Sequence, residues 1–331
     1  MYRIIGIESS PYAVKVRAVM RYRRLPYIWE SRMPQFFEET KNVKPLIMPV
    51  VQFPNGDYRT DSTPIVLELE TAHPGDRSIL PSHPGLAFLC LLIEDLADEW
   101  LTKSLFYRRF SDDENAQYGA GWVMDDAHPQ AAAEELTALI NDFISRQRGR
   151  MPIVGCMKEN EGALFDTHYR VLQALESFAS TNQFLFGTRP SLADFALYGQ
   201  LSTLNTDPAG LAIVRREAPR TERWVKKLDD ASGIEGEWHE IGNLPGAVEE
   251  LLSLAGEYYL PFLNANTQAL EAGSETLKVE LGGQSFTQPV YRYQYKCWDF
   301  LNKQYQGLET QAKELIEPIL ERSACLQHLR S

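Results

Sequence analysis

The first seventy residues alternate strand-like and helix-like patterns in an order that few folds accommodate. An apolar segment, residues 2–7, leads into Ser9, Ser10 and Pro11, and an apolar-basic helical pattern follows. A serine followed by a proline at this point is typical of a helix N-terminus. Helix N-termini carry unpaired N–H groups and a partial positive charge, so this tip favours a bound anion. Because Ser10 lies there, a thiolate is the anion that we expect.

The rest of this segment completes a small α/β unit. We expect a strand at 27–30, a short helix at 33–39, a strand at 48–53, a hairpin turn at 54–57, a returning strand from 58 and a helix from 62. The order βαβ and then ββα is that of a thioredoxin-type unit. Residues 1–72 are therefore predicted to form a thioredoxin-like domain.

A linker rich in proline and glycine, residues 73–84, separates this domain from a region of helical periodicity. We expect helices at 86–110, 129–148, 162–180, 191–205 and 219–228, with a loop or insertion at 111–128. The pattern predicts a helical domain over residues 85–231. An extra region, residues 232–331, combines helices around 245–271 and 289–306 with a hairpin at 277–286, and we expect it to pack on the helical domain.

The composition indicates which kinds of partner and which cellular location to expect. The chain has 45 acidic and 33 basic residues and a formal charge of −12, which argues against binding to nucleic acid or to an anionic membrane. The cysteines are far apart and form no metal-binding pattern, so no metal is predicted. No secretory signal and no apolar run long enough to span a bilayer are present, which predicts a soluble, cytoplasmic protein.

Three local patterns occur in a set order along the chain. They read SPYAVKVR from Ser10, IMPVVQFPNGDYRTDSTPI from Ile47 and GTRPSLADFALYGQL from Gly187. Together they resemble the cytosolic glutathione transferase family over residues 1 to about 230. The first pattern is similar to the active-site turn of omega-like and zeta-like members. Residues 232–331 have no counterpart in a typical member.

The resemblance implies an α+β fold of two domains, a thioredoxin-like domain and an all-helical one, here with an extra C-terminal region. It also implies a homodimer, with glutathione as co-substrate. Ser10 would donate a hydrogen bond to the glutathione thiolate, with Ser9 as the alternative donor. A serine cannot form a mixed disulfide with glutathione, so conjugation, isomerisation or dehalogenation is favoured over disulfide exchange.

The resemblance assigns four further residues to glutathione. Pro49 would follow a cis bond that leaves the backbone of Met48 free to pair with the cysteinyl part, although a trans proline opening an edge strand also fits the local sequence. Ser62 would hold the γ-glutamyl carboxylate and Asp61 would help with the ammonium group. A simple helix cap is the alternative for Asp61 and Ser62.

The second substrate would lie against Tyr12 and the inward face of the helix that contains Phe106 and Tyr107. Packing in the core is the alternative for each of these aromatic residues. Ser191 and Asp194 fit the spacing of a capping box and are predicted to be structural.

Two functions fit these patterns. The first is a glutathione transferase that activates the thiolate for attack on a small electrophile. The alternative is a non-catalytic protein of the same fold that binds a partner through residues 232–331, which are rich in aromatic residues.

Overall fold

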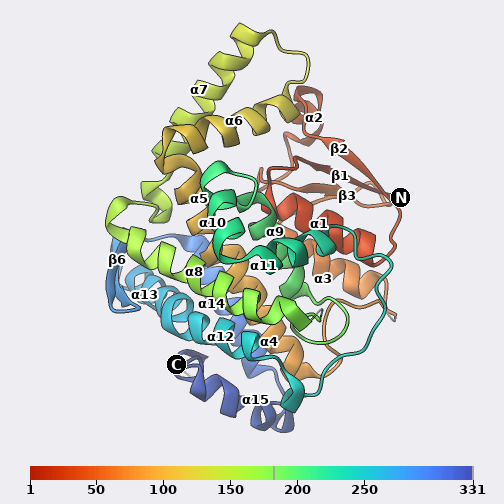
Figure 1. Cartoon of the computed structure of the whole chain (residues 1–331), viewed down its shortest axis with the longest axis vertical. Coiled ribbons are helices and arrows are strands. Elements are labelled where there is room, and N and C mark those ends of the chain that lie inside the picture. Colours follow the sequence, from red (N-terminus) through yellow and green to blue (C-terminus); the bar gives the residue numbers. More distant parts are fainter. Residues whose placement is uncertain (76, 182, 330–331) are drawn as a thin grey trace.

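The computed structural model describes residues 1–75, 77–181 and 183–329. Asp76, which belongs to the predicted linker, and the last two residues of the extra region lie outside the described residues, as does Asn182. The protein consists of a small mixed sheet with its helices, a bundle of long helices, and a C-terminal region with a two-stranded hairpin (Figure 1). Within the described residues, no helix is both long and apolar enough to cross a membrane.

The N-terminal domain is built on a four-stranded sheet. Its elements are β1 (Tyr2–Gly6), α1 (Pro11–Tyr22), β2 (Tyr27–Ser31), α2 (Pro34–Thr40), β3 (Val50–Gln52), β4 (Tyr58–Thr60) and α3 (Ser62–Ala72). The strands lie in the order β2-β1-β3-β4, with β1 parallel to β2 and antiparallel to β3. This is the expected thioredoxin-like order. Ile4 and Val51, paired across β1 and β3, are fully buried under the helices.

The second domain is helical, as expected. Its helices are α4 (Pro84–Asp95), α5 (Thr102–Ser111), α6 (Asp113–Ala127), α7 (Ala133–Arg150), α8 (Glu161–Phe178), α9 (Leu192–Leu204), α10 (Pro208–Glu217) and α11 (Pro219–Asp229). A π-helical segment, Leu96–Leu101, joins α4 to α5. The predicted capping box is present at the start of α9, where the Asp194 carboxylate accepts hydrogen bonds from the backbone and side chain of Ser191.

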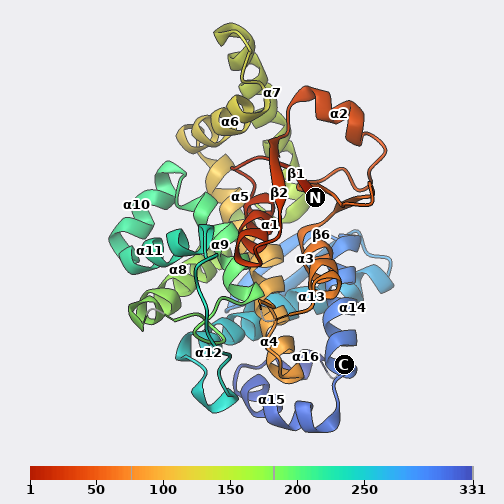
Figure 2. The same ribbon diagram turned by 90° about the vertical axis from the view of Figure 1, so that its right-hand side faces the viewer.

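The prediction of a loop at 111–128 is wrong, because most of this stretch forms helix α6. Asp112 caps its N-terminus by accepting from the backbone N–H of Asn115 at 3.0 Å. The buried face consists mostly of small residues, including Ala116, Gly119 and Ala120. Their low hydrophobicity hid the helical period, and polar residues fill the remaining positions. With α7, this helix projects from one end of the molecule (Figures 1 and 2).

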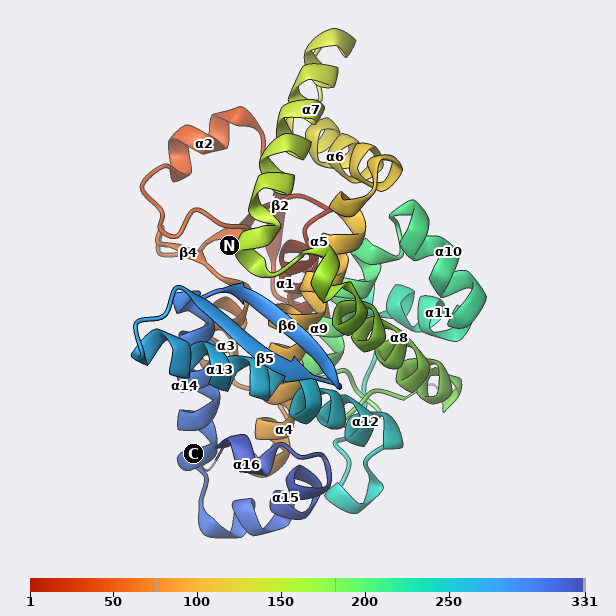
Figure 3. The same ribbon diagram turned by 90° about the vertical axis from the view of Figure 1, so that its left-hand side faces the viewer.

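The C-terminal region wraps around α4 at the opposite end. Its elements are α12 (Gly246–Leu254), α13 (Leu260–Glu271), β5 (Thr276–Leu281), β6 (Gln284–Pro289), α14 (Arg292–Gln306), α15 (Thr310–Arg322) and α16 (Leu326–Leu329). A π-helical segment, Ala255–Tyr259, joins α12 to α13. The predicted hairpin is present as β5–β6 (Figure 3). A side chain at Gly85 in α4 would lie 2.7 Å from Ile316 Cγ2 in α15, so glycine is required for this close packing.

The two domains meet where α1 packs against α9. A Cβ atom at Gly199 would lie 2.5 Å from the carbonyl oxygen of Pro11, so only glycine lets α9 approach the first turn of α1. Beneath this contact, the fully buried Lys15 of α1 donates hydrogen bonds to Glu94 and, at 2.6 Å, to Asp98. Burial lowers the pKa of Lys15, but the carboxylates of Asp98 and Glu94 outweigh it and hold that pKa above its usual value. The amine is therefore charged, and it links the domains.

We predict that Lys15→Met lowers the free energy of unfolding by about 3–5 kcal/mol, because it leaves two buried carboxylates without their counter-ion. Urea unfolding at neutral pH measures this change. Lys41→Met is the matched control, since the Lys41 side chain is 56% exposed and its ion pair with Glu38 is worth about 1 kcal/mol or less. Equal losses in the two variants would contradict the prediction.

Candidate functional site

The N-terminus of α1 presents two serines with different surroundings. Ser10 is the N-cap residue, and its Oγ accepts a long hydrogen bond of 3.4 Å from the Ala13 N–H. That contact uses the hydroxyl as an acceptor and leaves its proton available for an anion. Ser9 is also buried, and its Oγ has no hydrogen-bond partner among the described residues. Both hydroxyls can therefore donate a hydrogen bond, and the geometry of α1 favours neither Ser9 nor Ser10 as the donor to a thiolate.

The turn before α1 is fixed by the helical domain. Arg109 of α5 donates to the carbonyl oxygen of Ser9 at 3.2 Å and pairs with the buried Asp207 through two hydrogen bonds. On the other side, the Glu8 N–H donates to Asp126 of α6 at 3.2 Å. Neither contact could be predicted from local sequence patterns, because the residues involved are about a hundred positions apart.

The loop before β3 contains Met48 and Pro49. The bond between them is cis, as expected. Within the described residues, the backbone N–H and C=O of Met48 make no hydrogen bond. The Met48 side chain packs on a small cluster of Ile7, Val123 and Met124, so α6 covers one side of this loop. The free backbone groups fit a ligand with an extended peptide backbone.

Asp61 and Ser62 lie at the start of α3. Asp61 has a φ of 76°, a conformation that non-glycine residues rarely adopt and that often occurs at functional sites. Its Oδ2 accepts a hydrogen bond of 3.0 Å from the hydroxyl of Tyr293 in α14. Burial raises the pKa of Asp61, while the bond from Tyr293 opposes that shift. The Ser62 hydroxyl points inward and donates to Asp98 at 3.3 Å, which leaves the N–H groups of this helix end for an anion.

A pocket of about 340 Å³ lies beside these residues, between the two domains and the C-terminal region. Its walls come from α1, the π-helical segment, α5, α7 and α14. The residues that line it are Tyr12, Glu99, Thr102, Lys103, Phe106, Gln147, Arg150, Val154, Tyr291, Tyr293 and Gln294. Four of the lining residues are aromatic, and the polar side chains are those of Glu99, Thr102, Lys103, Gln147, Arg150 and Gln294.

Of the three residues predicted for the second substrate, the structure brings two together in this pocket. Tyr12 and Phe106 line it, and the Tyr12 hydroxyl donates to the carbonyl of Asp98 at 2.9 Å. Tyr107 is not among its lining residues. It faces α8, is 4% exposed and donates its hydroxyl proton to Glu161 at 2.8 Å. We therefore leave Tyr107 out of the proposed site.

Two domain families match this chain in order. The glutathione S-transferase N-terminal domain matches residues 4–77, and the glutathione S-transferase C-terminal domain matches residues 163–227. The chain therefore contains two segments that match the two domains of the glutathione S-transferase family. The matched domains are those of a glutathione S-transferase-like enzyme. Residues 1–3, 78–162 and 228–331 lie outside the two matches.

Several solved structures are similar in fold to this chain. One from Methylobacillus flagellatus KT, with glutathione bound, is 19% identical over 68% of this chain and 93% of its own, with a TM-score of 0.41. One from Methylobacterium radiotolerans JCM 2831, in complex with glutathione sulfonate, is 23% identical over 72% and 97%, with a TM-score of 0.43. The β-etherase LigF from Sphingobium sp. strain SYK-6 is 20% identical over 76% and 98%, with a TM-score of 0.47. Among curated proteins, none matches significantly.

The C-terminal region of this chain contributes three pocket residues that sequence reasoning missed: Tyr291, Tyr293 and Gln294. The available signal was the aromatic content of the helix predicted at 289–306. Nothing in the sequence connected that helix with Asp61, which lies 232 positions before Tyr293.

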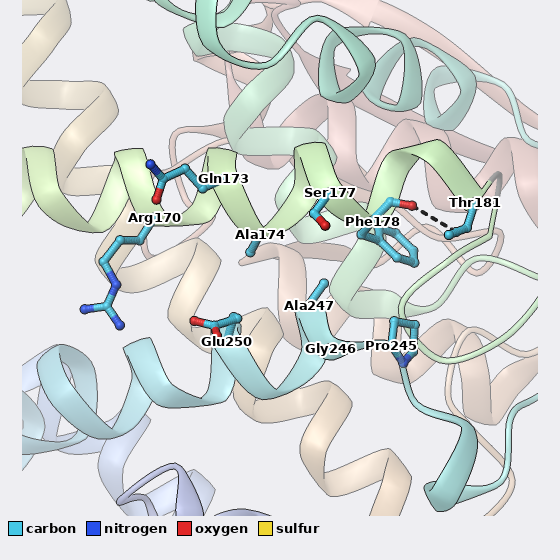
Figure 4. A pocket seen from close by; sticks show the side chains of 10 residues that line it. All are labelled: Arg170, Gln173, Ala174, Ser177, Phe178, Thr181, Pro245, Gly246, Ala247 and Glu250. Atoms are coloured by element: carbon cyan, nitrogen blue, oxygen red, sulfur yellow. Dashed lines mark hydrogen bonds between the residues drawn. The ribbon is translucent and has the colours of Figure 1, made fainter.

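A second cavity of about 640 Å³ lies between α8 and α12 (Figure 4). Arg170 and Gln173 line it from α8, and Glu250 lines it from α12. It has no lining residue from the N-terminal domain, so it is separate from the site described above.

We predict that Tyr293→Phe lowers the free energy of unfolding by about 1–3 kcal/mol, because the Asp61 carboxyl loses its hydrogen-bond donor. Urea unfolding provides the measurement. Tyr295→Phe is the matched control on the same helix, since Tyr295 is 37% exposed and is expected to change stability by less than about 0.5 kcal/mol. If both variants unfold like the native protein, the contact between Tyr293 and Asp61 does not hold α14 in place.

Proposed function

We propose that this chain is a glutathione transferase that activates the thiolate of glutathione for attack on a small electrophile. The observation that supports the proposal is the presence of three features in one matched N-terminal domain. They are the N-terminus of α1 with Ser10, the cis bond before Pro49 with the free backbone of Met48, and the N-terminus of α3 at Asp61 and Ser62.

Each feature suits one part of glutathione. The hydroxyl of Ser10 donates to the sulfur, the backbone of Met48 pairs with the cysteinyl part, and the N–H groups at Ser62 bind the γ-glutamyl carboxylate. Asp61 pairs with the ammonium group. No metal is assigned to this chemistry.

The hydroxyl of Ser10 and the N-terminus of α1 together can supply the free energy that thiolate formation requires. A free thiol has a pKa of about 8.5, and lowering it by two units takes roughly 2.7 kcal/mol. A hydroxyl hydrogen bond to an anion supplies about 1.5–3 kcal/mol, and the helix terminus about 0.3–1 kcal/mol. The electrophile then binds against Tyr12 and Phe106, in the pocket that the C-terminal region closes.

The packing of the C-terminal region supports an enzyme over a scaffold protein. Tyr305 is buried, and Tyr293 reaches Asp61, so these side chains are used within the chain. A homodimer follows from the family resemblance and a cytoplasmic location from the sequence composition, and both stay predictions. Light scattering on the purified protein measures its oligomeric state.

The first experiment is retention on immobilised glutathione together with turnover of chlorodinitrobenzene. A protein that neither binds nor reacts would fit the scaffold alternative.

We predict that Ser10→Ala raises the pKa of the bound thiol by one to two units and lowers kcat/KM about 10- to 100-fold, because the thiolate loses a hydrogen-bond donor. The acid limb of the pH profile then moves to higher pH. Thiolate absorbance of the glutathione complex and the rate with chlorodinitrobenzene measure both effects.

Ser9→Ala makes the same change one residue away and is the matched comparison. If Ser9→Ala shows the loss and Ser10→Ala keeps the rate, the donor is Ser9. Thermal unfolding is followed for both variants, since removing the cap at Ser10 costs about 1 kcal/mol by itself.

A further inference from the structure

Four acidic residues lie within six positions around the junction of α4 and the π-helical segment. Three of them have partners inside the protein. Glu94 and Asp98 accept from Lys15, and Asp95 accepts from the Tyr259 hydroxyl at 2.7 Å. The fourth acid, Glu99, lacks such a partner among the described residues.

Glu99 makes no hydrogen bond or ion pair with any described residue, and it lines the pocket next to Tyr12 and Tyr293. Those two tyrosines connect the pocket with the proposed glutathione site. Tyr12 lies two residues after Ser10 on α1, and Tyr293 donates to Asp61. A carboxyl group in this place is within the space that the second substrate would occupy.

The surroundings of Glu99 favour its protonated form. Burial raises the pKa of Glu99 well above its usual value, and the charges of Asp95, Asp98 and Asp61 raise it further. Lys103 of α5 opposes this, but burial lowers the pKa of Lys103 itself, and its Nζ donates to Val154 and Gln288. Four further titratable groups that interact with Glu99 are neutral when protonated: Tyr12, Tyr259, Tyr293 and Cys297. The guanidinium group of Arg150 lines the same pocket from α7.

A second polar group in the same pocket also lacks a partner. Gln294 is 4% exposed, and its Oε1 has no hydrogen bond among the described residues. A buried acceptor without a donor is costly, so it fits a ligand that brings a hydroxyl group. Within this pocket, Glu99 thus offers a donor and Gln294 offers an acceptor.

We propose that Glu99 is the proton donor to the second substrate, and that this substrate is an aromatic electrophile whose leaving atom is oxygen. This inference rests on the proposed transferase function. A carbon–oxygen bond breaks poorly unless the oxygen receives a proton, whereas a halide leaves without one. The acceptor at Gln294 binds the hydroxyl group that results.

The glutathione thiolate attacks carbon and forms the sulfur–carbon bond, while the electron pair of the carbon–oxygen bond moves to oxygen. The Glu99 carboxyl gives that oxygen its proton and becomes a carboxylate. Water restores the proton to Glu99 before the next cycle.

The test compares two probes, styrene oxide, which needs a proton at oxygen, and chlorodinitrobenzene, which releases chloride. We expect Glu99→Gln to lower kcat about 100-fold or more with styrene oxide and less than about tenfold with chlorodinitrobenzene, since a positioned acid contributes about 10²- to 10⁴-fold. Glu99→Asp keeps an acid and is expected to restore part of the styrene oxide rate. Glu250→Gln is the matched control, because Glu250 is exposed and lines the separate cavity of Figure 4.

A pH profile of the native enzyme tests the same point without a variant. Because Glu99 acts in its protonated form, the styrene oxide rate falls at high pH, and the chlorodinitrobenzene rate does not. Equal losses with both probes in Glu99→Gln, or a raised KM for glutathione with an unchanged kcat, would overturn the inference and leave the transferase function standing. A native enzyme that consumes neither probe overturns the proposed function itself.

Discussion

The buried contact between Lys15 and the carboxylates of Glu94 and Asp98 holds the elements of the candidate site in position. Lys15 belongs to the helix that begins at Ser10, and Asp98 also accepts from Ser62 at the start of α3. One carboxylate therefore sets the positions of both helix N-termini that would hold glutathione. Burying three charges is expensive unless each has a partner, so this network allows a single register between the sheet domain and the helices.

The C-terminal region covers α4, the helix that carries Glu94 and Asp95, and shields its buried acidic side chains from solvent. Helix α4 is buried along nearly its whole length, which is typical of a central helix. The region wraps it with α12, α14 and α15 and supplies Tyr259 to Asp95. The same region brings Tyr293 to Asp61 and Gln294 to the pocket. Covering α4 and closing the site are thus two results of one packing arrangement.

What the sequence predicted well is local. The serine and proline before α1, the hairpin after Pro49 and the capping box at Ser191 depend on neighbouring residues, and these elements were found from their patterns. Helix α6 was missed because small residues such as Ala116 and Ala120 bury a face without a strong apolar signal. The positions of Glu99 and Tyr293 could not be predicted, since they depend on contacts between segments far apart in the chain.

The π-helical segment gives a physical reason why Glu99 differs from Asp95. In an uninterrupted α-helix, residues four apart lie on one face, so these two carboxyls would share an environment. Here Asp95 meets Tyr259 in the interior, whereas Glu99 reaches the pocket from within the segment Leu96–Leu101. The wider winding of a π segment changes the direction of the residues it contains, and such segments often occur at functional sites. The local distortion thereby separates a structural carboxyl from one that is free to act on a substrate.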